Sequence, residues 1–587
     1  MRIERHQVGQ AAVSAARTDF TNRIGSQVRS MSKADRMTTY EWRMIADEFL
    51  DYLGALSVET PGLDTPEAKA ALKDASEAAA GSVAYAAYHP HCSFHVFLDY
   101  VNFGMSYEPG EDAPEESVTA WDWIDALCLA VLRDKAHWHG EAFHFARQKF
   151  AAEAQGTPVG ELVTGLTAVV LDDTGDEDEY PPSTQHKLAA VDAALERVRT
   201  RATETGRPLL DQPDSLALHA LRTLVAEDRD AFDTALAGLL TRHAARQSPA
   251  ASPSTLLPLV PLALAALAYR TLGWTPAVAS DYLPHALVTG FETRGPRVGG
   301  LGRDRRPDAV AALAAGRLTV ERPACERDGL PQVEALYGKN LRKAFAASDD
   351  EEGRVAVWRL GKAMNDQERL FKWRAGNPGN DTGAQLAAVR LASRLGAALF
   401  RIARAEPGTD VEVVIDGHTV RCAAERGDRA SAGHWQTAVS FALITGARED
   451  LAPLVLTGPV FAQPDGSAFA AYRKALHAYL TGDDPETAAQ LALRETEKAK
   501  DRGFPMPPAV LLSQLVEGDE ESFNLALADA LEAHRAHHQV ADRGDDPDAS
   551  VNLDVLALAC HARRRGWAIR VDSPYLPPDL LRTAEPF

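Results

Sequence analysis

Apolar side chains recur every three or four residues along most of the chain, which is the spacing of an amphipathic α-helix. Between residues 38 and 56 this stripe is made of Trp42, Ile45, Phe49, Leu53 and Leu56. Thr38 and Glu41 stand in the relation of the two partners of a capping box, which closes the start of a helix. The pattern therefore predicts a helix over this range, with Gly54 near its end.

Comparable stripes predict helices through both halves of the chain. They cover residues 67–88, 123–147, 186–202, 215–224, 229–242, 385–404, 435–445, 468–480 and 485–501. Period-two alternation is rare, but it favours a hairpin of residues 411–415 and 418–422 around an Asp416-Gly417 turn. Residues 94–98 are a weaker counterpart in the first half. The predicted fold class is all-α, or nearly so, with at most a small β-hairpin in each half.

One block of residues occurs twice, at a constant offset of 293 (567 − 274 for its tryptophan). The first copy is Gly273, Trp274, Val278, Ser280, Tyr282, Leu283 and Pro284, and the second is Gly566, Trp567, Val571, Ser573, Tyr575, Leu576 and Pro577. Seven matches at one spacing indicate that a module has been duplicated. We expect an N-terminal module at 1–290, a linker with a short helix at 291–330, and a divergent copy of the module at 331–587. The block itself is interpreted as a folding signature at the end of each module.

A shorter repeat lies inside the modules, at residues 225–236, 480–491 and 516–527. Each version combines the end of a helix, a tight turn with an aspartate cap, and the apolar face of a new helix. The last two versions are 36 residues apart (519 − 483). This spacing predicts helical hairpins stacked in a solenoid-like manner, although the tetratricopeptide consensus is absent.

The charge balance limits the partners that the chain can have. Among 587 residues the formal net charge is −21, which disfavours binding to a phosphate backbone and suits a basic protein. Five widely separated cysteines are typical of a reducing compartment, and the N-terminus has no apolar signal segment. The longest apolar stretch, 256–268, is too short to span a bilayer. We expect a soluble, cytoplasmic protein that binds neither membrane nor nucleic acid.

A cluster of His89, His91, Cys92 and His95 is the strongest candidate for metal chemistry. Imidazole nitrogens and a thiolate are zinc ligands, but this spacing matches no standard zinc signature. The corresponding stretch of the second copy contains neither histidine nor cysteine. A connection from helix to strand is therefore the preferred interpretation, with a metal site as the weak alternative.

Other chemistry-bearing patterns are no stronger. His137, His139 and His144 lack the glutamate spacing of a zinc protease, and the glycine-rich segment 295–306 lacks the end of a phosphate-binding loop. No Gly-x-Ser-x-Gly nucleophile signature occurs. We assign no catalytic residue and no cofactor.

One acidic run is a candidate partner-binding surface. It consists of Asp172, Asp173, Asp176, Glu177, Asp178 and Glu179. Such a run could present carboxylates to a basic protein and speed the encounter with it. The alternative is a solvated loop with no partner.

The first half of the chain resembles the bacterial immunity 49 family of polymorphic-toxin immunity proteins. The resemblance rests on residues 37–46 (MTTYEWRMIA), 57–62 (SVETPG), 138–147 (WHGEAFHFAR) and 281–288 (DYLPHALV). It covers roughly residues 1–320, and the second half resembles the family mainly through its last hundred residues. It implies an α-helical cytoplasmic protein that is encoded beside a toxin and blocks that toxin by binding it. The resemblance brings no binding residues with it.

Three hypotheses follow for the function. The first is non-catalytic inhibition of a cognate toxin, for which the acidic charge of the chain favours a basic protein, and the second is a helical-repeat scaffold or regulator without a toxin. The third is a metal-dependent enzyme that uses the cluster at residues 89–95.

Overall fold

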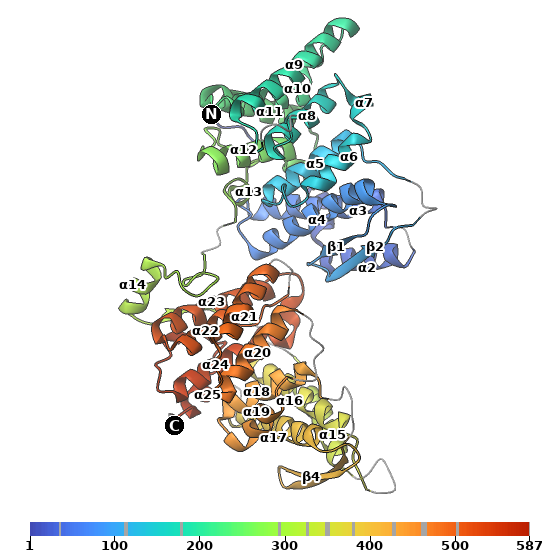
Figure 1. Cartoon of the computed structure of the whole chain (residues 1–587). Coiled ribbons are helices and arrows are strands. Elements are labelled where there is room, and N and C mark those ends of the chain that lie inside the picture. The colour runs from blue at the N-terminus through green and yellow to red at the C-terminus, as the bar shows by residue number, and fades with distance from the viewer. Residues whose placement is uncertain are drawn as a thin grey trace. The chain divides into compact units, whose positions relative to one another are not determined.

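Helices dominate both halves of the chain in the computed structural model (Figure 1). The structure describes residues 1–34, 37–110, 115–175, 180–291, 295–324, 328–346, 353–377, 382–424, 430–459, 466–500 and 504–585. Helix accounts for 65% of the structure, and the named strands in these ranges form two-stranded sheets. The predicted fold class is therefore confirmed. The chain divides into two compact units, Met1–Thr293 (unit 1) and Arg294–Phe587 (unit 2).

Unit 1 is a series of helices interrupted by one hairpin. Its elements are α1 (Gln10–Arg17), α2 (Phe20–Lys33), α3 (Thr39–Glu59), α4 (Pro66–Tyr88), β1 (Phe94–Leu98), β2 (Phe103–Tyr107), α5 (Ala120–Leu132), α6 (Gly140–Gln148), α7 (Ala151–Ala154), α8 (Pro158–Val170), α9 (Thr184–Thr205), η1 (Leu209–Asp211), α10 (Pro213–Val225), α11 (Arg229–Arg246), η2 (Pro253–Leu256), α12 (Leu259–Leu272) and α13 (His285–Thr289).

Unit 2 repeats this order with an added segment at its start. Its elements are α14 (Pro307–Ala315), β3 (Leu318–Thr319), α15 (Leu330–Phe345), α16 (Trp358–Gly376), α17 (Thr382–Arg404), β4 (Asp410–Ile415), β5 (His418–Ala423), α18 (Ala432–Thr445), α19 (Arg448–Thr457), α20 (Ala468–Thr481), α21 (Glu486–Ala499), α22 (Ala509–Glu517), α23 (Glu520–His538), η3 (Arg543–Asp545), η4 (Pro547–Ser550), α24 (Leu553–Arg564), β6 (Val571–Asp572) and α25 (Pro578–Thr583).

Local sequence accounts for where α3 begins. Thr38 and Glu41 form both halves of the predicted capping box, and the Thr38 amide donates to the Glu41 carboxylate at 3.1 Å. The Trp42 and Phe49 side chains are fully buried. The helix packs along α4, whose alanine-rich face permits close contact.

Stacked helical hairpins fill the second part of each unit, as the shorter repeat predicts. Helices α8 to α11 pack each on the next, and so do α20 to α23. The turn aspartates act as caps, with Asp228 accepting from the Ala231 amide at 3.1 Å and Asp519 from the Ser522 amide at 3.0 Å. Asp484, one residue before the N-cap Pro485, accepts from the Glu486 amide at 3.1 Å.

Both predicted hairpins are present. Strands β4 and β5 pair antiparallel, and Ile415 faces His418 next to the turn. Asp416 and Gly417 have φ values of 50° and 81°, the left-handed pair that a two-residue turn of this kind requires. Strands β1 and β2 form the counterpart in unit 1.

The prediction of one helix over residues 123–147 is wrong. Helix α5 ends at Leu132 and α6 begins only at Gly140. Asp134 has a φ of 58°, and the Lys135 amide donates back to the Ala130 carbonyl at 2.8 Å, which turns the chain out of the helix. His137 therefore lies in the turn and shares no helix face with His144.

The segment expected to link the modules packs into unit 2 from residue 295 onward. Val298, Leu313 and Val320 are buried in the core of that unit. Arg297 donates to Asp529 and Glu532 of α23, each at 2.8 Å. Strand β3 also pairs parallel with β6, a short sheet beyond the predicted hairpin. The glycine and arginine content of this segment favoured a linker. The contacts that hold it are made with residues far away in the sequence, so local composition does not show them.

The two units share a frame of equivalent side-chain hydrogen bonds and aromatic ring contacts. The Trp123 indole donates to the Phe143 carbonyl at 2.9 Å, and the Trp435 indole donates to the Leu454 carbonyl at 3.0 Å. The Tyr282 and Tyr575 rings each lie edge-on to a histidine, at 5.2 and 5.1 Å. The tryptophan pair fixes α5 as the equivalent of α18, with an offset of 312 (435 − 123).

The equivalent arginines Arg270 and Arg564 complete this frame. Arg270 donates to the last carbonyls of α5, Val131 and Leu132, at 2.6 and 2.9 Å. Arg564 donates in the same way to Leu443 and Ile444 at the end of α18. Each guanidinium thus satisfies carbonyls that the end of a helix leaves unpaired.

One segment of the described residues, Pro253–Leu272, is apolar and long enough to cross a membrane. More than half of its apolar 18-residue window, 56%, is buried inside the molecule. Leu262 and Ala265 of α12 are fully buried among the other helices of unit 1. Contacts of this kind are typical of a helix packed in a protein core.

Candidate functional site

The candidate metal ligands at residues 89–95 do not converge. His89 stacks on Tyr85 with 4.4 Å between ring centroids, while His91 Nε2 lies 3.2 Å from a Glu115 carboxylate oxygen. His95 Nδ1 lies 3.0 Å from the Ser106 hydroxyl, and Cys92 is exposed. Within the described ranges no three His, Cys, Asp or Glu side chains are grouped to hold a metal ion. The segment forms the connection between α4 and β1, the preferred interpretation.

The acidic run at residues 172–179 is described only in part. Residues 176–179 lie outside the described residues. Asp172 forms an ion pair with Lys187, and Asp173 forms one with Arg147 at 3.7 Å and lies 2.8 Å from the His144 imidazole. Its two described carboxylates therefore already have cationic partners within unit 1.

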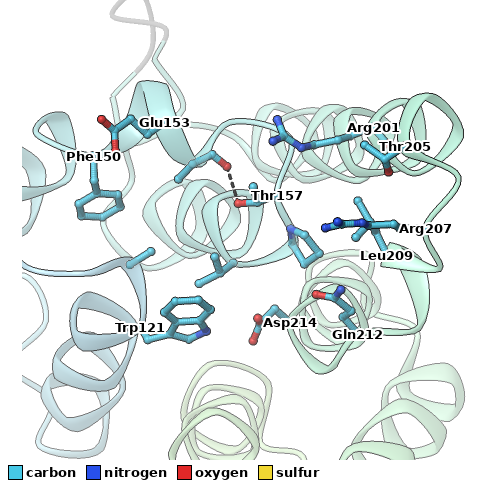
Figure 2. Close-up of a pocket in the computed structure, with 14 residues that line it drawn as sticks. Trp121, Phe150, Glu153, Thr157, Arg201, Thr205, Arg207, Leu209, Gln212 and Asp214 are labelled. Carbon is cyan, nitrogen blue, oxygen red and sulfur yellow. Dashed lines mark hydrogen bonds between the residues drawn. The ribbon is translucent and has the colours of Figure 1, made fainter.

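An open pocket of about 440 Å³ lies in unit 1, where the starts of α5, α8 and α10 meet the end of α9 (Figure 2). Trp121 and Phe150 lie on one side of it, while Arg201 and Arg207 lie on the opposite side. Asp214 is near Trp121 at the lower edge of the view. The pocket thus combines aromatic, acidic and basic side chains from helices far apart in the sequence.

Trp121 is the most distinctive side chain of the pocket. It stands in the first turn of α5 and is 60% exposed, whereas Trp123, two residues later, is fully buried. An indole left in solvent next to carboxylates is suited to contact both an apolar surface and a cation.

A group of carboxylates around Asp125 adjoins the pocket through Asp214, which lines the pocket and repels Asp125. The Asp125 side chain reaches solvent, but protein atoms surround it closely enough to desolvate its carboxyl group. This desolvation, followed by repulsion from Asp122, Asp47 and Asp214, raises the pKa of Asp125 to about 7. The positive charge of Arg43, which pairs with Asp122 at 2.8 Å, opposes the shift. Burial also raises the pKa of Asp214, against a hydrogen-bonding effect of Trp121. An added cation would relieve this repulsion.

Unit 2 does not carry the same groups at the equivalent positions. With the offset of 312, Trp121 corresponds to Gly433, Asp122 to His434 and Asp125 to Thr437. The capping boxes of the two helices, Thr119 with Asp122 and Ser431 with His434, support this register. The aromatic and acidic character of the α5 surface is thus specific to unit 1.

The net charge is divided unequally between the units. Unit 1 has 24 Lys and Arg against 41 Asp and Glu, a formal charge of −17, whereas unit 2 has 38 against 42, a charge of −4. Most of the acidity that characterises the whole chain therefore belongs to unit 1.

The residues of the pocket do not stand out in the sequence because carboxylates are abundant in the chain. A signal was nevertheless present. The apolar stripe of α5 contains Trp123 and Leu127, which leaves Trp121, Asp122 and Asp125 on the polar side of the same helix. The signal is the position of this tryptophan on the same polar face as two carboxylates.

Comparison with known families gives a match in both units. The family model of immunity protein 49 matches residues 62–287 and 377–580, one segment in each unit. This supports the duplication that the repeated block predicts. No curated protein and no solved structure matches the chain.

Proposed function

Because the chain belongs to the immunity protein 49 family, we propose that it binds a cognate bacterial toxin and neutralises it without catalysis. The observation that carries the proposal is that the family model matches more than half of the chain, in both units. Immunity proteins protect the cell that makes a toxin, so the partner is a protein encoded beside this chain.

We further propose that the toxin is basic where it is contacted. The formal net charge of −21 attracts a basic protein over a distance, and nucleic acid would be repelled. Many nucleases have basic active sites, so a toxin that attacks nucleic acid fits this charge. The protein would act in the cytoplasm, where such a toxin meets its target.

Two surfaces are candidates for the contact. The first is the loop of Asp172, Asp173, Asp176, Glu177, Asp178 and Glu179, proposed from its charge alone. The second is the pocket at the start of α5. Asp172 and Asp173 already have ion-pair partners, which favours the pocket.

The proposal is tested by expressing the toxin domain encoded next to this chain, with and without the chain, in the same host. We expect the toxin alone to stop growth, and co-expression to restore growth and yield a complex that co-purifies. A chain with its helices intact that neither protects the host nor binds the toxin would contradict the proposal.

A further inference from the structure

We propose that unit 1 makes the principal contact with the toxin and that the pocket at Trp121 receives a lysine or arginine side chain of it. This rests on the proposed function and adds to it a site, a partner chemistry and a division of labour between the two units. The family match covers both units and does not distinguish between them.

The chemistry of the pocket suits a cationic side chain. The exposed Trp121 indole supplies a face on which a guanidinium or ammonium group can stack. Asp214 stands beside it in the pocket lining, and Asp125, four residues after Trp121, contributes to the same acidic group. Charge-assisted hydrogen bonds from a cation to these carboxylates would fix the inserted side chain.

Repulsion among the carboxylates of the free protein also favours a cation. Desolvation, followed by repulsion from Asp122, Asp47 and Asp214, raises the pKa of Asp125, and Arg43 opposes that shift. Repulsion among these carboxylates costs free energy in the unbound protein, and a bound cation reduces that cost. The positive starts of α5 and α10 moderate the repulsion without removing it.

The arginines across the pocket determine how a bound segment lies. Arg201 donates to the Gln155 carbonyl at 2.9 Å, and Arg207 is exposed. A cationic side chain is repelled from them and directed towards Trp121 and Asp214. The other side of the pocket is then suited to backbone carbonyls or a carboxylate of the same toxin segment.

The differences between the units assign the contact to unit 1. Unit 2 has kept the buried frame of unit 1 but has Gly433, His434 and Thr437 where unit 1 has the tryptophan and two aspartates. His434 caps its own helix, as Asp122 does in unit 1, but it carries no carboxylate and lies 3.4 Å from the Asn365 amide. Unit 2 has 38 Lys and Arg against 42 Asp and Glu, a formal charge of −4. Unit 2 therefore has little long-range attraction for a basic partner.

The test measures the affinity of the full-length chain for the adjacent toxin domain by titration calorimetry. Trp121→Ala is expected to weaken binding by about 30-fold, the effect of losing a central aromatic contact. Asp125→Asn, which keeps the size of the side chain, is expected to weaken binding by about tenfold. Trp138→Ala and Asp64→Asn are matched controls in unit 1 outside the pocket, and both are expected to bind as the unaltered chain does.

The outcomes separate this inference from the proposed function. If the unaltered chain does not bind the toxin, the proposed function fails and the inference fails with it. If the unaltered chain binds and both pocket variants bind equally well, the inference alone is wrong. The inference alone is also wrong if affinity is lost on neutralising residues 176–179 or on Trp358→Ala in unit 2, and kept in the pocket variants. If Trp121→Ala unfolds at a lower temperature than the unaltered chain, the affinity of Asp125→Asn for the toxin decides whether the inference holds.

Discussion

Asp125 makes the proposed contact sensitive to pH. Its pKa is raised to about 7 in the free protein by desolvation and by Asp122, Asp47 and Asp214. A bound cation favours the ionised form and lowers this pKa, so binding releases a proton near neutral pH. We expect the affinity to fall by about tenfold from pH 8 to pH 6, measured by calorimetry.

Asp125→Asn is the control for this pH dependence. The variant should bind more weakly at pH 8 and lose most of the dependence between pH 8 and pH 6. An unaltered chain with equal affinity at both values would show that Asp125 does not participate in the contact.

Arg564 and Arg270 are expected to be among the most important single residues for stability. Arg564 is buried and donates to two carbonyls in the last turn of α18, Leu443 and Ile444. Replacing it by methionine leaves these carbonyls unpaired, and we expect a loss of about 2–3 kcal/mol in the unfolding of unit 2, measured by urea denaturation. Arg270→Met should have a similar effect on unit 1.

The matched control is Arg563→Met on the same helix. A constant offset of 293 would make Arg563 the equivalent of Arg270 in unit 2, but the hydrogen bonds show that Arg564 is the equivalent residue. The reason is that Arg270 stands three residues before Gly273, whereas Arg564 stands two before Gly566. An equal loss of stability from Arg563→Met would contradict this equivalence.

At the scale of elements, the segment 295–317 is held to unit 2 by ion pairs and an apolar anchor. Arg297 lies between Asp529 and Glu532 of α23, which raise the pKa of its guanidinium, and Val298 is fully buried. We expect Arg297→Met to speed hydrogen exchange in α14 by more than tenfold, because two carboxylates lose their partner.

Arg305→Met is the comparison for that experiment. Arg305 also pairs with two carboxylates, Asp519 and Glu521, but its side chain is more exposed. Its loss should change hydrogen exchange little, since exposed pairs contribute below about 1 kcal/mol. Equal effects of the two variants would show that the segment is not held by Arg297.

These elements also show what sequence can predict. The capping box of α3 and the Asp416-Gly417 turn are predicted because their partners lie within three residues. The docking of residues 295–317 and the pairing of β3 with β6 depend on contacts more than 200 positions apart, such as Arg297 with Asp529. The break after α5 escapes prediction because apolar spacing continues through it while the backbone turns.

At the scale of the whole molecule, the duplication could be predicted and the difference between its copies could not. The repeated block reports only what both units need in order to fold, such as the rings of Tyr282 and Tyr575 against a histidine. The pocket forms where the starts of three helices meet, and a local sequence pattern does not predict which helices lie next to one another. The uneven charge was present in the sequence, but its meaning depends on where the units divide.

The most direct test of the proposed mechanism is a titration of toxin activity with the full-length chain. Inhibition by binding through unit 1 predicts that activity falls linearly and reaches zero at one chain per toxin, and that the toxin is recovered unmodified. An endpoint of two toxins per chain would show that unit 2 binds equally, which contradicts the assignment to unit 1. Inactivation by far less than one chain per toxin would indicate catalysis and contradict inhibition by binding.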